Sequence, residues 1–360
     1  EIKPGPVELG FNTSFILPAT LDRVPCIYID GHHTLNLDPG DPISVSYKQP
    51  VGNWPTGAAH PELLKLKPSH AHNQTIINGV SRIGYMTGGR SALWVDEEIS
   101  TVLAARAVKF IEDNKAKPFF LYFATHNIHV PRMVNKRFAG KSIMGARGDA
   151  ILEMDWMTGQ ILQTLKRLKL TGNTLIVFTS DNGPVLDDGY QDEAAERLYG
   201  HKPAGPYRGG KYSAFDGGTR VPMIVSWPGH VRKGISNALI SQIDFVASFA
   251  AFTGRPFPGG RYLDSHDALD VLLGKTNTGR DYVIEQALNN TLSIIKGDWK
   301  YIEPSKGPAI NKFTHTELGN NPQPQLYNLT ADDAEKNNTA AANPQKLNEL
   351  KTLLEEVMKK

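Results

Sequence analysis

Apolar residues recur at helical spacing in two long stretches of the chain. The first stretch opens with the acidic residues 96–98, which favour the first turn of a helix, and its apolar stripe consists of Ile99, Val102, Leu103, Ala107, Phe110 and Ile111. The second stretch predicts a helix that closes at Gly172, with a stripe formed by Ile151, Met154, Thr158, Ile161, Leu162, Leu165 and Leu168. We therefore expect two amphipathic helices, each with one buried face.

Short, continuous apolar runs alternate with these helices. They cover Phe119 to His126, Thr174 to Thr179 and Arg220 to Gly229, and their length suits strands that are buried on both faces. Alternating helices and buried strands are typical of an α/β fold with a mostly parallel central sheet flanked by helices. We predict that fold class for the main body of the chain.

The two ends of the chain differ from this main body. Residues 1 to about 90 are rich in Pro, Gly, Asn and His, which predicts long loops with short strands. Residues 291–304 and 325–329 predict a small antiparallel sheet, and Asn343 as N-cap before Pro344 predicts a terminal helix with the stripe Leu347, Leu350, Leu354, Val357 and Met358. We expect a catalytic domain over residues 1–280 and a C-terminal subdomain over residues 281–360.

Composition narrows the possible functions. The chain has 39 Lys and Arg against 37 Asp and Glu, without a long basic run, which argues against nucleic acid as a partner. No stretch approaches the roughly 18 uninterrupted apolar residues of a membrane span. Cys26 is the only cysteine, so internal disulfides and Cys-based metal clusters are excluded, and its apolar surroundings predict a buried, inert thiol.

Polar side chains follow two of the predicted strands. His126 and His129 come at the exit of the first strand, and Asp181 and Asn182 follow the second. Ligands of open α/β sheets bind at the carboxyl ends of the strands, and a carboxylate beside an amide oxygen suits Ca²⁺ or Mg²⁺. The alternatives are a strand-ending turn for Asp-Asn-Gly and a capping or core role for the histidines.

A glycine-rich loop, residues 207–222, precedes the third predicted strand. It carries Arg208 and Lys211, and its glycines let the backbone approach a ligand closely. A lysine there is a point charge suited to an oxyanion such as sulfate or phosphate, although solvated loop lysines are common. Four further histidines are interpreted as surface loop residues: His32, His33, His70 and His72.

The ordered set of His-x-x-His-x-Pro, Asp-Asn-Gly-Pro, Gly-x-Lys and Asp-Gly-Gly-x-Arg-Val-Pro resembles the formylglycine-dependent sulfatases of the alkaline phosphatase-like superfamily. The resemblance runs from about Gly10 to the C-terminus. It implies hydrolysis of sulfate monoesters of sulfated carbohydrates or aryl alcohols, and a periplasmic or secreted location. It further implies Asp181 and Asn182 as ligands of Ca²⁺ or Mg²⁺, Lys211 and His126 as catalytic residues, and Arg208, His129 and His201 as substrate-binding residues.

The chain also departs from the family pattern. The C/S-x-P-x-R motif that yields the formylglycine nucleophile does not occur in the sequence, and Asp216 stands where many relatives have Glu. The sequence begins without Met, so we expect the chain to be the C-terminal part of a sulfatase that is inactive alone and pairs with the missing N-terminal part. Two alternatives stay open: a phosphatase or phosphodiesterase with a zinc pair near Asp187, Asp188 and His201, and a non-catalytic carbohydrate-binding relative.

Overall fold

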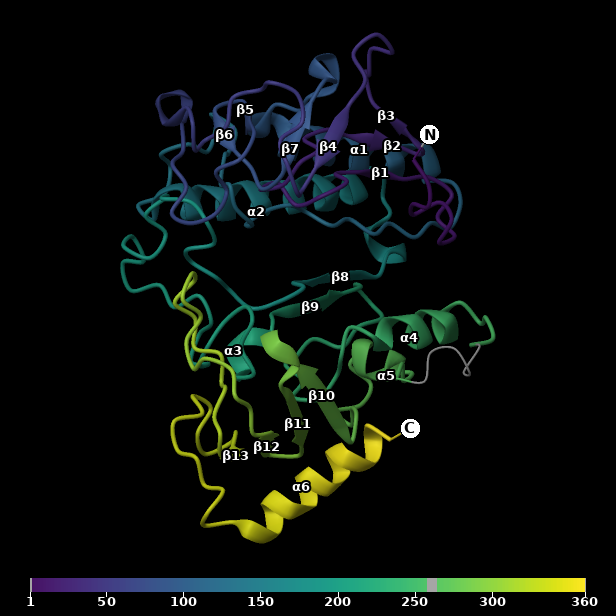
Figure 1. The fold of residues 1–360 in the computed structure, drawn as a ribbon. Helices are drawn as coiled ribbons and strands as arrows, with labels where there is room; N and C mark the ends of the chain where they lie inside the picture. The colour runs from purple at the N-terminus through teal and green to yellow at the C-terminus, as the bar shows by residue number, and fades with distance from the viewer. Residues whose placement is uncertain (1, 258–263, 360) are drawn as a thin grey trace. The chain divides into compact units, whose positions relative to one another are not determined.

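The computed structural model describes residues 2–257 and 264–359, and the chain separates into two compact units (Figure 1). The first unit comprises Glu1–Leu170 and Leu186–His201, and the second comprises Thr171–Val185 and Lys202–Lys360. Glu1, the first residue of the predicted N-terminal loop, lies outside the described residues. The predicted domain boundary at residue 280 falls inside the second unit and stays a prediction.

The first unit joins two long helices to several very short strands. Figure 1 shows α1 (Ile99–Asn114) beside α2 (Gly145–Arg167), and the two helices pack against each other. The strands form three antiparallel sheets, as expected for the loop-rich N-terminal region: β1 (Phe15–Ile16) with β2 (Ile29–Asp30) and β3 (His33–Thr34); β4 (Ser44–Ser46) with β7 (Tyr85–Thr87); and β5 (Ile76–Ile77) with β6 (Val80–Ser81). The main hydrophobic core of this unit includes Cys26, Ile27, Trp94, Ile99 and Leu103.

The prediction for α1 is confirmed, and the prediction for α2 is right about the helix but only partly right about its buried face, to which Leu165 belongs. The α1 stripe is buried at Ile99, Leu103, Ala107 and Ile111. In α2, Leu162 is 46% exposed, whereas Asp149 and Glu153 are buried because they accept backbone hydrogen bonds from loop residues. Hydrophobic periodicity does not register buried polar groups of this kind. The helix also ends at Arg167, before Lys169 in the left-handed region, rather than at Gly172.

The second unit contains the predicted C-terminal sheet and helix. Four antiparallel strands, β10 (Tyr282–Gln286), β11 (Leu292–Lys296), β12 (Trp299–Ile302) and β13 (Gln325–Asn328), form one sheet, and α6 (Pro344–Val357) packs on it through Leu350 and Leu354. Asn343 is the N-cap residue, as predicted, but its side-chain amide donates to the Thr339 carbonyl instead of capping the helix. The unit also contains α3 (Asp216–Thr219), α4 (Asp244–Phe252) and α5 (Leu269–Leu272).

The predicted parallel central sheet is not found in the described residues. The second and third runs form β8 (Ile176–Thr179) and β9 (Met223–Ser226), which pair antiparallel, and parallel pairing among the described residues is confined to isolated bridges. The first run forms no strand in the part of the chain that the structure describes: Phe119, Leu121 and Phe123 are partly covered, while Phe120 and Tyr122 are 58% and 73% exposed. Apolar content favours burial, but it does not determine strand direction or supply a neighbouring strand.

Among the described residues, no helix combines the length and the apolar composition that a membrane crossing requires.

Candidate functional site

The Asp-Asn-Gly-Pro segment lies against the glycine-rich loop inside the second unit. The Gly183 N–H donates to the Gly218 carbonyl at 2.8 Å, and the Lys211 N–H donates to the Pro184 carbonyl at 2.9 Å. Gly183 is required by this close approach, because a Cβ there would lie 1.7 Å from the Gly217 oxygen. The structure thus brings the predicted metal ligands and the predicted sulfate-binding lysine onto neighbouring backbone segments.

Asp181 and Asn182 offer oxygen donors directly after β8. An Asp181 carboxylate oxygen accepts the Asn182 N–H at 2.9 Å, and the Asn182 side-chain NH₂ donates to the Gly183 carbonyl at 2.9 Å. This second bond engages the amide nitrogen of Asn182 and not its amide oxygen. The donor chemistry fits one side of a Ca²⁺ site, but the residues described include no group of three or more His, Cys, Asp or Glu arranged to hold a metal.

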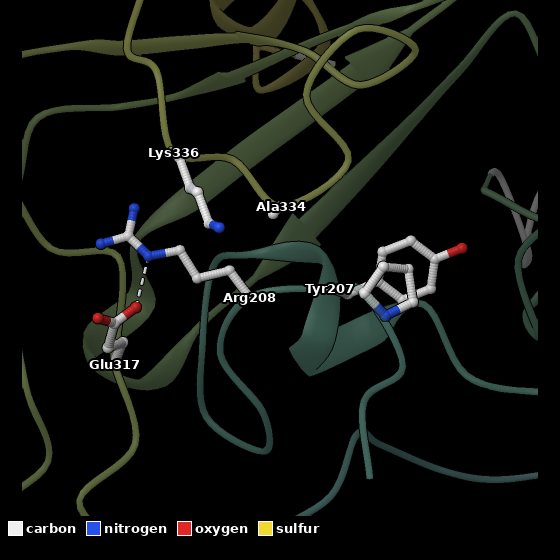
Figure 2. A pocket seen from close by; sticks show the side chains of 6 residues that line it. Tyr207, Arg208, Glu317, Ala334 and Lys336 are labelled. Atoms are coloured by element: carbon white, nitrogen blue, oxygen red, sulfur yellow. Dashed lines mark hydrogen bonds and ion pairs between the residues drawn. The ribbon is translucent and has the colours of Figure 1, made fainter. Parts of the chain in front are cut away.

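Arg208 and Lys211 occupy different surroundings in the loop. The Arg208 guanidinium pairs with Glu317, donates to the Glu335 backbone carbonyl at 2.8 Å and stacks over the Phe215 ring, 4.1 Å from its centroid. Figure 2 shows the pocket of about 450 Å³ at this point, where Arg208 and Glu317 lie on one side and Tyr207 on the other. The Lys211 ammonium lies 5.2 Å from the centroid of the Tyr212 ring. Arg208 is therefore held by several contacts at the wall of a pocket.

A buried ion cluster lies next to this loop. The Lys300 ammonium, on β12, is 2.9 Å from Asp216, 3.1 Å from Glu285 and 3.4 Å from Glu335, and its side chain is fully buried. Glu335 is also buried, and an oxygen of its carboxylate accepts the Asp216 N–H at 2.6 Å. One lysine is thus shared by carboxyl groups from three separate segments. Asp216, which differs from the family pattern, is part of this cluster.

The Glu335 carboxyl gives the cluster a testable pH dependence. Burial, together with repulsion from Asp216 and Glu285, raises the pKa of Glu335 to about 7, while Lys300 and the bond from the Asp216 N–H act in the opposite direction. The Arg208 guanidinium also lies close, on the Glu335 backbone carbonyl. The folded protein therefore retains a proton that the unfolded chain releases near pH 4.5, the ordinary pKa of a glutamate side chain.

We expect the stabilising contribution of this group to fall by about 2 to 3 kcal/mol as pH rises from 4.5 to 7. The measurement is urea unfolding of the wild type and of Glu335→Gln at pH 5, 6, 7 and 8. The free energy of unfolding of the wild type relative to that of the Gln variant should decrease over this interval. A difference that stays constant would contradict the assignment of the raised pKa to Glu335.

In the first unit, His126 is partly buried next to α1. Its Nε2 lies 3.3 Å from the Ser100 hydroxyl of α1, and its Nδ1 is buried with no hydrogen-bond partner among the described residues. Burial lowers the pKa of His126 to about 4, so the ring is neutral at pH 7. A neutral ring can accept or donate one hydrogen bond, but it is a poor source of a proton for a leaving group.

His129 lies in a more polar environment. Its Nδ1–H donates to the Val130 carbonyl at 2.8 Å, and its Nε2 is 3.8 Å from the Asp188 carboxylate. These contacts place a backbone carbonyl and a carboxylate beside the two ring nitrogens of His129.

The interpretation of His72 as a surface residue is wrong. Its ring is 6% exposed, its Nε2 is 3.0 Å from Asp22, and a Cβ on Gly189 would collide with it. Burial favours a raised pKa for the Asp22 carboxyl, but hydrogen bonds from His72 and Thr20, together with charge interactions with His129 and His72, lower this pKa to about 2. His72 and Asp22 form a hydrogen bond with each other inside the protein. The spacing of residues in the sequence does not reveal such a long-range pair.

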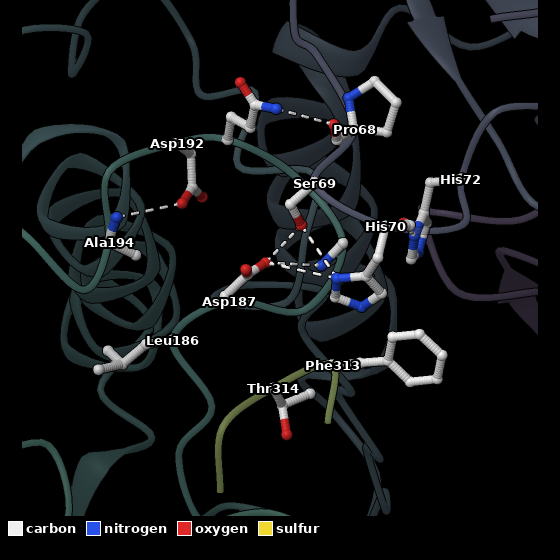
Figure 3. A network of polar contacts seen from close by, with 12 residues as sticks. Pro68, Ser69, His70, His72, Leu186, Asp187, Asp192, Ala194, Phe313 and Thr314 are labelled. Atoms are coloured by element: carbon white, nitrogen blue, oxygen red, sulfur yellow. Dashed lines mark hydrogen bonds and ion pairs between the residues drawn. The ribbon is translucent and has the colours of Figure 1, made fainter. Parts of the chain in front are cut away.

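Figure 3 shows a second polar network of the first unit, around Asp187. Its carboxylate accepts from the Ser69 hydroxyl at 2.6 Å and from the Gly189 N–H at 3.2 Å, and it lies 3.8 Å from His70. These contacts hold the segment 187–189 against Ser69 and His70. His201 is exposed at the end of this unit. In the part of the chain that the structure describes, the residues proposed for a zinc pair form no metal cluster.

Sequence reasoning missed the residues that hold the glycine-rich loop. Lys300 lies in the apolar strand stretch Trp-Lys-Tyr-Ile, and a lysine at an inward-facing strand position is a recognisable signal of a buried ion pair. Glu335 lies in a polar loop after β13 and carries no comparable signal.

Comparisons with known proteins indicate the same family as the sequence motifs. A protein-family model described as Sulfatase matches residues 42–255. The chain is 56% identical over 357 residues to an N-acetylgalactosamine-6-O-sulfatase of Bacteroides thetaiotaomicron, a match that covers 99% of this chain and 70% of that protein. It is 30% identical to human arylsulfatase A over 273 residues, which cover 70% of this chain and 52% of that enzyme.

Solved structures show the same relationship. A Bacteroides thetaiotaomicron sulfatase, described in connection with the metabolism of multiple glycosaminoglycans, superimposes with a TM-score of 0.98 at 55% identity, covering 99% of this chain and 74% of that one. A sulfatase from Pseudoalteromonas sp. matches with a TM-score of 0.60 at 26% identity, over 73% of this chain and 52% of that one.

The family match spans more than half of the chain, so the chain belongs to the sulfatase family, whose members are hydrolases of sulfate esters and share the alkaline phosphatase-like fold. The comparisons do not bear out the further expectation that the chain is the C-terminal part of a longer enzyme, which stays a prediction. They favour neither a phosphatase nor a non-catalytic relative.

Proposed function

We propose that this sulfatase removes the 6-O-sulfate of N-acetylgalactosamine in a sulfated carbohydrate. The observation that carries the proposal is the 56% identity to an N-acetylgalactosamine-6-O-sulfatase over nearly the whole chain. The match covers 99% of this chain and so includes the glycine-rich loop and the Asp-Asn-Gly-Pro segment, which lie together in the second unit. The finer substrate assignment rests on this likeness.

Within the second unit, we assign the binding of sulfate to Lys211 and the binding of Ca²⁺ or Mg²⁺ to Asp181 and Asn182. The backbone bond between Lys211 and Pro184 supports this assignment, because it fixes the lysine close to the segment that carries the oxygen ligands. When bound, the cation would supply positive charge for sulfate oxygens. Lys211 would hold a second sulfate oxygen and favour the negative charge that develops there during ester cleavage.

The two histidines of the first unit keep their predicted roles. His129, whose Nε2 lies 3.8 Å from the Asp188 carboxylate, stays a predicted substrate-binding residue. His126, predicted as a catalytic residue that contacts the sulfate and leaving-group oxygen, is retained as a neutral hydrogen-bonding group. Arg208 and His201 stay predicted substrate-binding residues.

A panel of sulfated monosaccharides tests the substrate assignment. The full-length gene product should release sulfate from 6-O-sulfated N-acetylgalactosamine with a kcat/KM at least about tenfold above that for the 4-O-sulfated isomer, since the two differ by a pocket contact worth about 1 to 3 kcal/mol. The control is 6-O-sulfated N-acetylglucosamine, which differs from the proposed substrate only in the configuration at C4. Equal or greater activity on the 4-O-sulfated isomer would refute the assignment.

We also expect the 360-residue chain to bind Ca²⁺ weakly, with a dissociation constant of about 10⁻³ M or weaker, because Asp181 and Asn182 supply only two of the six to eight oxygens that Ca²⁺ prefers. Calorimetric titration of the chain measures this affinity. The matched control is the double variant Asp181→Ala, Asn182→Ala, which should abolish any residual binding. Micromolar affinity that the double variant removes would show a complete site and contradict this expectation.

A further inference from the structure

The loop that carries Lys211 is fastened at both ends by one residue from outside the family match. Glu335 accepts the Asp216 N–H through its carboxylate at 2.6 Å, and it accepts the Arg208 guanidinium through its backbone carbonyl at 2.8 Å. Arg208 precedes Lys211 and Asp216 follows it, whereas the matched family segment ends at residue 255. Glu335 therefore closes the segment 208–216 around the lysine.

The same segment is closed internally by backbone bonds. The Gly217 N–H donates to the Arg208 carbonyl at 2.8 Å, and the Ser213 N–H donates to the Gly210 carbonyl at 2.9 Å. Gly217 has no room for a side chain, since a Cβ would lie 2.4 Å from the Arg208 oxygen. The two ends of segment 208–216 are therefore packed directly on each other. Loss of the hydrogen bond between Glu335 and the Asp216 N–H would disturb one of these ends.

Lys300 makes the Glu335 contact possible. Glu335 and Asp216 are both buried, and two neighbouring buried carboxylates repel each other unless a cation lies between them. The Lys300 ammonium supplies that cation at 2.9 Å from Asp216 and 3.4 Å from Glu335. The arrangement joins β12, the loop after β13 and the start of α3 through one fully buried charge.

We propose that Glu335 and Lys300 are positioning residues for Lys211: they hold segment 208–216 in the conformation in which the lysine binds sulfate. The inference rests on the proposed role of Lys211. Neither residue is a catalytic residue, because Glu335 acts through Arg208 and Asp216 and Lys300 acts through Asp216 and Glu335.

Inhibition by inorganic sulfate tests this role, because the inhibition constant reports the anion site directly. In the full-length gene product, Glu335→Ala should raise that constant about tenfold, the equivalent of one hydrogen bond to a charged group. Glu335→Gln should restore most of the loss, since an amide oxygen can still accept the Asp216 N–H. The matched control is Glu349→Ala, which removes an exposed carboxylate of α6 and should change nothing.

The decisive comparison repeats Glu335→Ala in the Lys211→Ala background. If Glu335 acts through Lys211, the second substitution should add little to the inhibition constant. Hydrogen exchange of the amides of residues 208–218 provides the parallel readout: exchange should accelerate in Glu335→Ala and return toward wild type in Glu335→Gln. This measurement does not depend on turnover, so it remains informative if the Ala variant is inactive.

The results separate failure of this inference from failure of the proposed function. A tenfold effect of Glu335→Ala that persists unchanged in the Lys211→Ala background would overturn the positioning role, as would unaltered exchange of the loop amides. An unchanged sulfate inhibition constant in Lys211→Ala alone would instead remove Lys211 from the anion site, and with it the role on which the inference rests.

Discussion

Replacing Lys211 by alanine is expected to lower kcat/KM of the full-length enzyme for a sulfate ester by about 10²–10³-fold, the loss typical when one preorganised group that stabilises developing charge is removed. The loss should appear chiefly in kcat, since the lysine interacts more strongly with the oxygens as their charge increases. Steady-state kinetics on 6-O-sulfated N-acetylgalactosamine measure both constants.

The matched control for this substitution is Lys202→Ala. Lys202 is an exposed lysine of the same unit that precedes the glycine-rich loop, and it should retain wild-type kinetics. If Lys211→Ala retained wild-type rates, the lysine would have no role in the reaction. If both variants lost activity equally, the effect would reflect general electrostatics and not a specific contact.

Replacing Lys300 by alanine is expected to lower the free energy of unfolding by about 3 to 5 kcal/mol, because it leaves the buried carboxylates of Asp216, Glu285 and Glu335 without their shared cation. Urea denaturation followed by circular dichroism measures the change. Lys296 on β11 pairs with Asp281 at the surface, so Lys296→Ala should change stability by about 1 kcal/mol or less.

A loss below about 1 kcal/mol in Lys300→Ala would show that the carboxylates take up protons or solvent at little cost, and would contradict the account of the cluster. If the alanine variant fails to fold, Lys300→Arg provides the comparison, since it retains the charge while changing its shape. That variant should keep most of the stability.

The spacing of apolar residues along the sequence predicted the helices and strands that depend mainly on local contacts. The α1 helix and the α6 helix follow directly from the helical spacing of their apolar residues, and β11 to β13 follow from short apolar runs. The parallel sheet was not predictable in the same way, because pairing depends on which segments lie side by side. The run from Phe119 to His126 has the composition of a buried strand and yet forms none in the described residues.

The candidate site was predictable as far as its residues lie in compact motifs. Asp181, Asn182 and Lys211 were identified from such motifs, and the structure holds their backbone segments together. The environment of each side chain was not predictable: the low pKa of His126 arises from burial, and the contacts of Arg208 come from Glu317 and Glu335, more than 100 residues away in sequence. Long-range contacts of this kind leave no spacing to detect.

The central claim is that the glycine-rich loop and the Asp-Asn-Gly-Pro segment serve the hydrolysis of sulfate esters. The most direct measurement compares kcat/KM of the full-length gene product for an aryl sulfate and for the aryl phosphate with the same leaving group, with metal content determined on the same sample. We predict that the sulfate ester is hydrolysed faster, with one Ca²⁺ or Mg²⁺ per molecule. Faster hydrolysis of the phosphate ester, with two zinc ions bound, would contradict it.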